Sequence, residues 1–111
     1  MRNDDPEAVF EVLADPTRRR VVQLLGRRPH RAGELAGAVG ATPPVMSRHL
    51  RILLDAGLVV DERMSGDARV RVFRLRSEPL TALQGWIDEV QSHWKAQLGS
   101  FKRHVERRKS Q

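Results

Sequence analysis

The stretch TPPVMSRHLRILLDAG, residues 42–57, predicts a short helix whose two faces carry different chemistry. Its apolar side chains recur at helical spacing and can pack inward; they are Val45, Leu50, Leu53 and Leu54. Ser47, Arg48 and Arg51 fall between these positions and point away from the apolar face. A helix that buries one side and offers hydroxyl and guanidinium groups on the other suits the reading of a DNA major groove.

The same helix carries signals for both of its ends, and a second short helix precedes it. Thr42 is expected to cap the first turn, and Pro43 suits the first helical position. Gly57 can adopt the left-handed conformation that ends a helix. The preceding helix has the apolar residues Leu35, Ala36 and Val39. Because Gly40 ends it, the two helices are joined at a glycine, which is typical of a helix-turn-helix at about residues 31–57.

Two helices that begin with proline lie upstream. Asp5 and Pro6 begin the first, and residues 15–16 repeat the pair of a capping acid and a proline. The apolar stripes are Val9, Phe10 and Leu13 in the first helix and Val21, Val22, Leu24 and Leu25 in the second. The three arginines at residues 18–20 spread over roughly 200° of the second helix and cannot form one patch. We expect at least one of them to make a structural ion pair, with nucleic-acid contact as the alternative.

A β-hairpin, or wing, is expected at about residues 58–76. A strand begins at residues 58–60, the turn lies at residues 65–67, and residues 68–75 form the returning strand. The alternation of the returning strand slips at Phe73, which predicts a bulge or the end of the ladder there. Three arginines flank the tip: Arg63, Arg69 and Arg71. They can contact the DNA backbone or the minor groove and position the protein, or they can simply be solvated.

The last and longest helix is expected at about residues 78–107. Its apolar stripe comprises Leu80, Leu83, Ile87, Val90, Trp94, Leu98, Phe101 and Val105. The stripe runs beyond what one small bundle can cover, which favours a partner helix. Trp86 and Trp94 suit the core of an interface, with a ligand pocket as the alternative.

Composition narrows the classes of function. The chain of 111 residues is expected to form one domain, and its net charge of +6 favours a polyanionic partner. The absence of cysteine excludes disulfides, thiolate metal sites and a cysteine nucleophile. No glycine-rich phosphate loop and no paired acids are present, so we expect no enzyme and no cofactor. With no apolar signal region and no apolar run long enough for a membrane span, we expect a cytoplasmic protein.

Histidines of the last helix are the remaining candidates for a metal site. His93 and His104 lie eleven residues apart, too far for one ion within one helix. Two antiparallel helices of a dimer can bring one histidine from each chain together. Gln91 and Arg107 stand where further ligands are needed, however, and an arginine repels a cation. We therefore expect no metal, with a metal-responsive regulator kept as an alternative.

Three motifs carry a family resemblance: ADPTRRRVVQLL at residues 14–25, GELAGAVG at residues 33–40 and SRHLRILLDAGLV at residues 47–59. Together they resemble the ArsR/SmtB-type winged-helix repressors over nearly the whole chain. PLTALQGWIDEVQSHWKAQL, residues 79–98, further resembles a branch of the family that lacks metal ligands. The resemblance implies a mainly α fold with a small β-hairpin, the winged helix-turn-helix.

The resemblance also implies a homodimer joined by its first and last helices, a recognition helix at residues 42–56 and a wing at residues 64–71. The implied DNA-binding residues are Thr42, Pro44, Val45, Ser47, Arg48, His49, Arg51, Arg63, Arg69 and Arg71. The implied dimer contacts are Val9, Phe10, Leu83, Ile87, Val90, Trp94, Leu98 and Phe101. For His49, a partly buried packing role remains the alternative. The Cys-x-Cys of metal-sensing members is replaced by residues 36–38, Ala-Gly-Ala.

These observations lead to one hypothesis and two rivals. The hypothesis is a dimeric, sequence-specific DNA-binding repressor that occupies an inverted-repeat operator. The rivals are a metal-responsive repressor and a winged-helix module that binds another protein. The sequence names no operator and no small-molecule effector.

Overall fold

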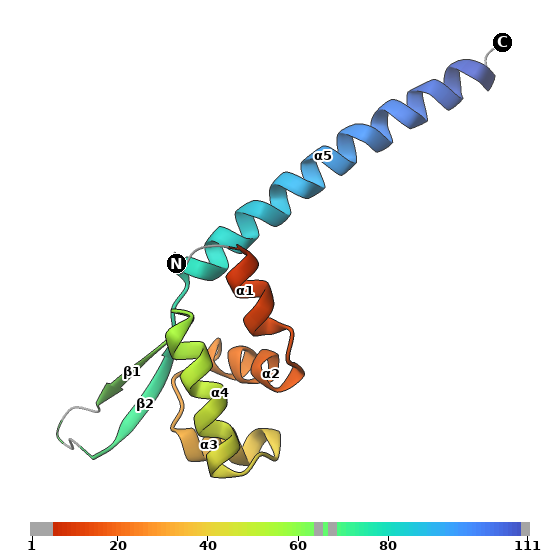
Figure 1. The fold of residues 1–111 in the computed structure, drawn as a ribbon. Helices are drawn as coiled ribbons and strands as arrows, with labels where there is room; N and C mark the ends of the chain where they lie inside the picture. Colours follow the sequence, from red (N-terminus) through yellow and green to blue (C-terminus); the bar gives the residue numbers. More distant parts are fainter. Residues whose placement is uncertain (1–5, 64–65, 67–68, 110–111) are drawn as a thin grey trace.

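The computed structural model describes residues 6–63, 66 and 69–109, and its element order is the one expected from the sequence. The elements are α1 (Pro6–Leu13), α2 (Pro16–Leu25), α3 (Ala32–Val39), α4 (Pro43–Asp55), β1 (Val59–Arg63), β2 (Arg71–Leu75) and α5 (Glu78–Lys109). Helices α1 to α4 and the hairpin form a body from which α5 projects (Figure 1). The fold is therefore mainly helical with a two-stranded wing, a winged helix-turn-helix.

The core lies where α1 to α4 meet the base of the hairpin. Its buried members include Val9, Val12, Val21, Leu24, Leu25, Leu35, Met46, Leu50, Leu53, Leu58, Val59 and Phe73. In α4 the buried residues are Met46, Leu50 and Leu53, at the i, i+4, i+7 spacing of one helix face. Of the inward-facing set expected from the sequence, Leu50 and Leu53 are confirmed, whereas Val45 and Leu54 are only half-buried. Met46, which is 1% exposed, was missed, although helix geometry places it between Leu50 and Leu53 on the same face.

Helix ends follow the sequence in three places and depart from it in one. The Asp15 carboxylate accepts from the backbone N–H of Thr17 at 2.8 Å, as its capping role requires. Gly40 and Gly57 have φ of 71° and 75°, the left-handed conformation expected at helix ends. Thr42 occupies the N-cap of α4, but its side chain makes no capping hydrogen bond. The expected capping hydrogen bond is absent: Pro44, at the second helical position, has no N–H to donate, and the N–H of Val45 at the third position does not donate to the Thr42 side chain.

The hairpin is regular and its ladder continues past Phe73, so the bulge or ladder end expected there is wrong. Strands β1 and β2 are antiparallel, with five consecutive pairs from Val59↔Leu75 to Arg63↔Arg71. On its other edge, the Phe73 N–H donates to the carbonyl of His30 at 2.8 Å. The broken alternation has a different cause: buried Phe73 faces the core, while half-buried Val72 lies on the opposite face of the strand.

Both strands are shorter than expected. β1 begins at Val59 instead of Leu58, and β2 begins at Arg71, whereas the sequence placed the returning strand from Ala68. Within the expected turn, Gly66 is described and has a φ of 90°. Residues 64–65 and 67–68 lie outside the described residues.

Among the described residues, it is the first turns of α5 that contact the body. The helix has 32 residues, a length of about 48 Å at the usual rise per residue. Leu80 and Leu83 pack against the core, and Trp86 meets Phe10 of α1 edge to face, with ring centroids 5.2 Å apart. Beyond this point the helix leaves the body (Figure 1), and the principal extents of the molecule are 75 × 27 × 24 Å. Within the described ranges, no helix is both long and apolar enough to cross a membrane.

Candidate nucleic-acid interface

The outward face of α4 presents polar and cationic side chains on a fixed helix. Ser47, Arg48 and Arg51 are exposed, while the opposite side of the helix is held in the core by Met46 and Leu53. Neither Arg48 nor Arg51 is paired with a carboxylate among the residues that the structure describes. An arginine in this state can offer its parallel N–H groups to a base edge or to a phosphate without first leaving a partner.

The amino-terminal end of α4 lies beside this face. Thr42 and Pro44 are exposed, and Val45 is half-buried. The first turn of α4 therefore presents small side chains, which allow another surface to approach the helix closely. In helix-turn-helix proteins, this end of the recognition helix is the part that contacts bases.

His49 is placed differently from the other expected readers. It is half-buried, and its Nδ1 lies 3.4 Å from Nη1 of Arg18 on α2. This is the packing role that the sequence had left as the alternative. Arg18 also lies 4.0 Å from a carboxylate oxygen of Asp15, which confirms the structural ion pair expected within residues 18–20.

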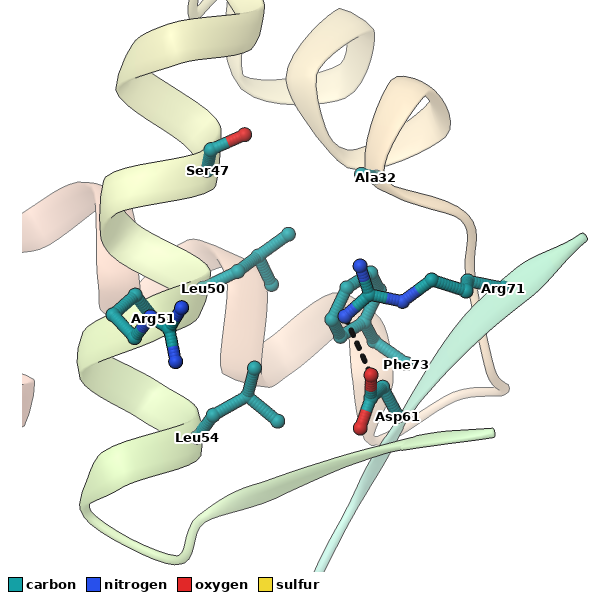
Figure 2. Close-up of a pocket in the computed structure, with 8 residues that line it drawn as sticks. All are labelled: Ala32, Ser47, Leu50, Arg51, Leu54, Asp61, Arg71 and Phe73. Atoms are coloured by element: carbon teal, nitrogen blue, oxygen red, sulfur yellow. Dashed lines mark hydrogen bonds and ion pairs between the residues drawn. The ribbon is translucent and has the colours of Figure 1, made fainter. Parts of the chain in front are cut away.

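A hollow of about 490 Å³ separates α4 from the hairpin (Figure 2). It is lined by Ala32, Ser47, Leu50, Arg51, Leu54, Asp61, Arg71 and Phe73. Inside it, Arg71 pairs with the carboxylate of Asp61 and lies 5.2 Å over the ring of Phe73. Two expected readers of α4, Ser47 and Arg51, thus share one groove with the wing. The Asp61–Arg71 pair was not found from the sequence, because it joins diagonal positions of two strands.

The arginines of the wing differ in their surroundings. On the face opposite Arg71, the guanidinium of Arg74 donates two hydrogen bonds to Glu62, at 2.6 and 3.0 Å. Arg63, at the end of β1, and Arg69, in the turn before β2, are exposed on either side of the tip. The structure therefore brings Arg63 and Arg71 together as a cross-strand pair at the end of the ladder.

Two carboxylates near the helix-turn-helix are held in their charged form. The pKa of Asp15 is lowered, chiefly because the carboxylate accepts the backbone N–H of Arg18. The pKa of Glu34 is lowered because it accepts the backbone N–H of Arg31, at 3.1 Å, and then the Arg28 guanidinium, at 3.0 Å. Glu34 thereby takes the place of a polar N-cap at the start of α3, since the Arg31 side chain cannot accept a hydrogen bond.

A second candidate surface is the apolar face of α1 and α5. Its exposed members are Phe10, Trp86, Val90, Trp94, Leu98 and Phe101, with Trp94 58% and Phe101 67% exposed. Leu83 and Ile87 are half-buried. Val9, expected at a dimer interface, is 1% exposed and packs in the protein's own core, so it offers no surface to a partner. A run of large apolar side chains of this kind marks an interaction surface.

Among the residues that the structure describes, the histidines of α5 have no set of partners that could complete a metal site. His93 is exposed, and its Nε2 lies 3.2 Å from the side-chain nitrogen of Gln97. Over residues 6–63, 66 and 69–109, no group of three or more His, Cys, Asp or Glu side chains is arranged to hold a metal ion.

Comparisons with known proteins identify the family. A helix-turn-helix domain model matches residues 13–62. The HTH-type transcriptional regulator Rv2034 of Mycobacterium tuberculosis is 39% identical over 83 residues, 75% of each chain. A crystal structure of the ArsR family transcriptional regulator RHA00566 is 35% identical, with a TM-score of 0.69 over 80% of this chain and 89% of that one. This chain belongs to the ArsR family.

Membership of the ArsR family confirms the expected class of function. The protein is a DNA-binding transcriptional regulator with a winged helix-turn-helix, and the family is not one of enzymes. The transcriptional repressor SdpR of Bacillus subtilis is 38% identical over 55 residues, which cover 50% of this chain and 61% of SdpR. The comparisons match the predicted resemblance, and the chain has no cysteine with which to build a thiolate metal site.

Proposed function

We propose that this ArsR-family protein is a homodimeric repressor whose two α4 helices enter successive major grooves of an inverted-repeat operator. The observation that carries the proposal is the exposed Ser47, Arg48 and Arg51 on a helix whose other side is buried. The two helices of the dimer would stand about 34 Å apart, one turn of the double helix.

The pairing of two copies is supported by the apolar face of α1 and α5. Phe10 and Trp86 meet edge to face at the base of this face, and Trp94, Leu98 and Phe101 continue it along α5. Since these side chains are exposed in the described part of the chain, a second copy that presents the same face in antiparallel sense would bury them on both sides. Such an isologous contact is the usual geometry of a twofold dimer.

The proposal gives the cations different roles. Arg48 and Arg51 read base edges or adjacent phosphates, and Ser47 supports them with its hydroxyl. Thr42 and Pro44 let the DNA backbone approach the first turn of α4. Arg63 and Arg69 contact phosphates from the wing. Arg71 has a mainly structural role, because Asp61 already holds its guanidinium.

Salt titration of binding to a duplex tests the proposal. With about eight phosphate contacts per dimer, the logarithm of affinity should fall against the logarithm of salt concentration with a slope near −7. Light scattering after size exclusion should give the mass of a dimer. A monomer that binds no duplex at low salt would contradict the proposal and leave a protein-interaction module as the better explanation of the exposed α5 face.

A further inference from the structure

The side chain of Arg18 is largely buried at an unusual position. Arg18 is the third residue of α2, and its side chain is 16% exposed. A cation in the first turn of a helix opposes the helix dipole, so acceptors must compensate for it. Three acceptors surround the guanidinium, and they come from the ends or middle of three different helices.

The contacts of Arg18 connect these helices through one group. Its Nε donates to the carbonyl of Val12 near the end of α1, at 2.6 Å. Its Nη1 lies 4.0 Å from Asp15, the cap of α2, and 3.4 Å from Nδ1 of His49 in the middle of α4. One guanidinium therefore joins the end of α1, the start of α2 and the side of α4.

This junction stands between the two surfaces of the proposed function. On one side, α1 packs on α5 through the edge-to-face contact of Phe10 and Trp86. On the other side, His49 immediately follows Arg48, one of the exposed arginines of α4. The junction fixes α4 relative to α1 and α5. In a dimer that must match the pitch of DNA, a small rotation of both α4 helices changes the fit at both half-sites.

We propose that Arg18, acting through the ring of His49, is a positioning residue that holds α4 at the angle to α1 and α5 at which two copies fit successive major grooves. The inference rests on the proposed function and adds to it a pair of residues that act without touching DNA. His49, expected from the sequence to be a reader, instead supports the readers beside it.

The contact has a chemical condition. Nδ1 of His49 accepts from the Arg18 guanidinium only when the ring is neutral and carries its proton on Nε2. The charged groups recorded beside the ring are Arg18 and Asp15 of α2, and Arg48 precedes it on α4. One turn away on α4 the residues are apolar: Val45, Met46, Ile52 and Leu53.

The test uses duplexes that the wild-type protein selects from a randomised pool. His49→Asn keeps an acceptor near the position of Nδ1, so it should bind these duplexes like wild type. His49→Leu removes the acceptor and should lose about tenfold in affinity.

Coupling separates positioning from direct contact. Arg18→Lys keeps the charge but cannot span the three acceptors, and it should lose about as much affinity as His49→Leu. Because both changes break one contact, the double variant should bind no worse than the weaker single variant. Thermal melting of each variant checks that the fold persists.

The outcomes are distinct. Losses that multiply in the double variant, or a His49→Asn protein that loses as much affinity as His49→Leu, would overturn the positioning role while leaving the proposed function in place. Failure of the wild-type protein to select any duplex would contradict the proposed function itself.

Discussion

The outward face of α4 and the hairpin both carry arginines, but the two regions hold them differently. Arg48 and Arg51 of α4 are exposed and, among the described residues, have no carboxylate partner. Arg71 and Arg74 of the wing are paired with Asp61 and Glu62. A guanidinium that already has a carboxylate partner must give it up before it can neutralise a phosphate. Of these four arginines, the two on α4 can therefore neutralise a phosphate without first losing a carboxylate partner.

The difference between α4 and the wing depends first on a rigid α4, and buried Met46 holds this helix in the core. Met46→Ala removes a side chain that is 1% exposed and should lower the free energy of unfolding by about 2–5 kcal/mol. Urea denaturation monitored by circular dichroism measures this loss. Val45→Ala is the matched control, since Val45 is half-buried, and it should cost less. Equal losses in the free energy of unfolding at the two positions would contradict the assignment of Met46, and not Val45, to the buried face of α4.

The second way to break the contrast is to separate the two α4 helices. Trp94→Glu puts a charge in the exposed apolar face of α5 and should dissociate the dimer, with about a hundredfold loss of affinity for a selected duplex. Light scattering and fluorescence anisotropy measure the two effects. Ser92→Glu adds the same charge about 200° around the helix and should change neither. A Trp94→Glu protein that remains dimeric would remove α5 from the interface.

A third test compares the two sets of arginines directly. Arg48→Ala should lower affinity for a selected duplex about 10–100-fold while barely changing binding to an unrelated duplex, since a bidentate contact to a base contributes about 1–3 kcal/mol. Arg74→Ala removes the same charge from a paired site and should change affinity less than about twofold. If the two variants behaved alike, the difference between α4 and the wing would have no functional meaning.

The smallest expected effect comes from releasing a paired arginine of the wing, which makes it resemble the arginines of α4. Asp61→Asn releases Arg71 and should raise affinity for unrelated duplexes about twofold to fivefold at low salt, with a steeper salt slope by about one per subunit. Glu62→Gln releases Arg74 on the opposite face of the hairpin and serves as the control, with little change expected. An unchanged salt slope in Asp61→Asn would show that Arg71 lies away from the DNA.

Local signals in the sequence predicted much of this structure. Asp15 before a proline, and the glycines at positions 40 and 57, mark helix ends because their effects act within a few residues. The sequence also predicted correctly that at least one arginine of residues 18–20 makes a structural ion pair, because helix geometry alone points the three side chains in different directions.

What the sequence could not predict depends on contacts between distant segments. The bridge between Phe73 and His30, on the edge of β2 that does not face β1, joins segments far apart in the sequence. The placement of His49 reflects Arg18, thirty-one residues earlier. Val9 was expected at a dimer interface but lies in the core, because a stripe on a short helix does not reveal which neighbour covers it. Pairing of Asp61 with Arg71 likewise appears only once two strands are in register.

The central claim is that two copies of the exposed α4 face read DNA at one helical pitch. Selection of duplexes from a randomised pool by the purified protein, followed by sequencing, tests it most directly. The account predicts enrichment of an inverted repeat whose half-site centres lie about 10 base pairs apart, and loss of that enrichment in Arg48→Ala. Recovery of no common sequence, or of the same repeat by the variant, would contradict it.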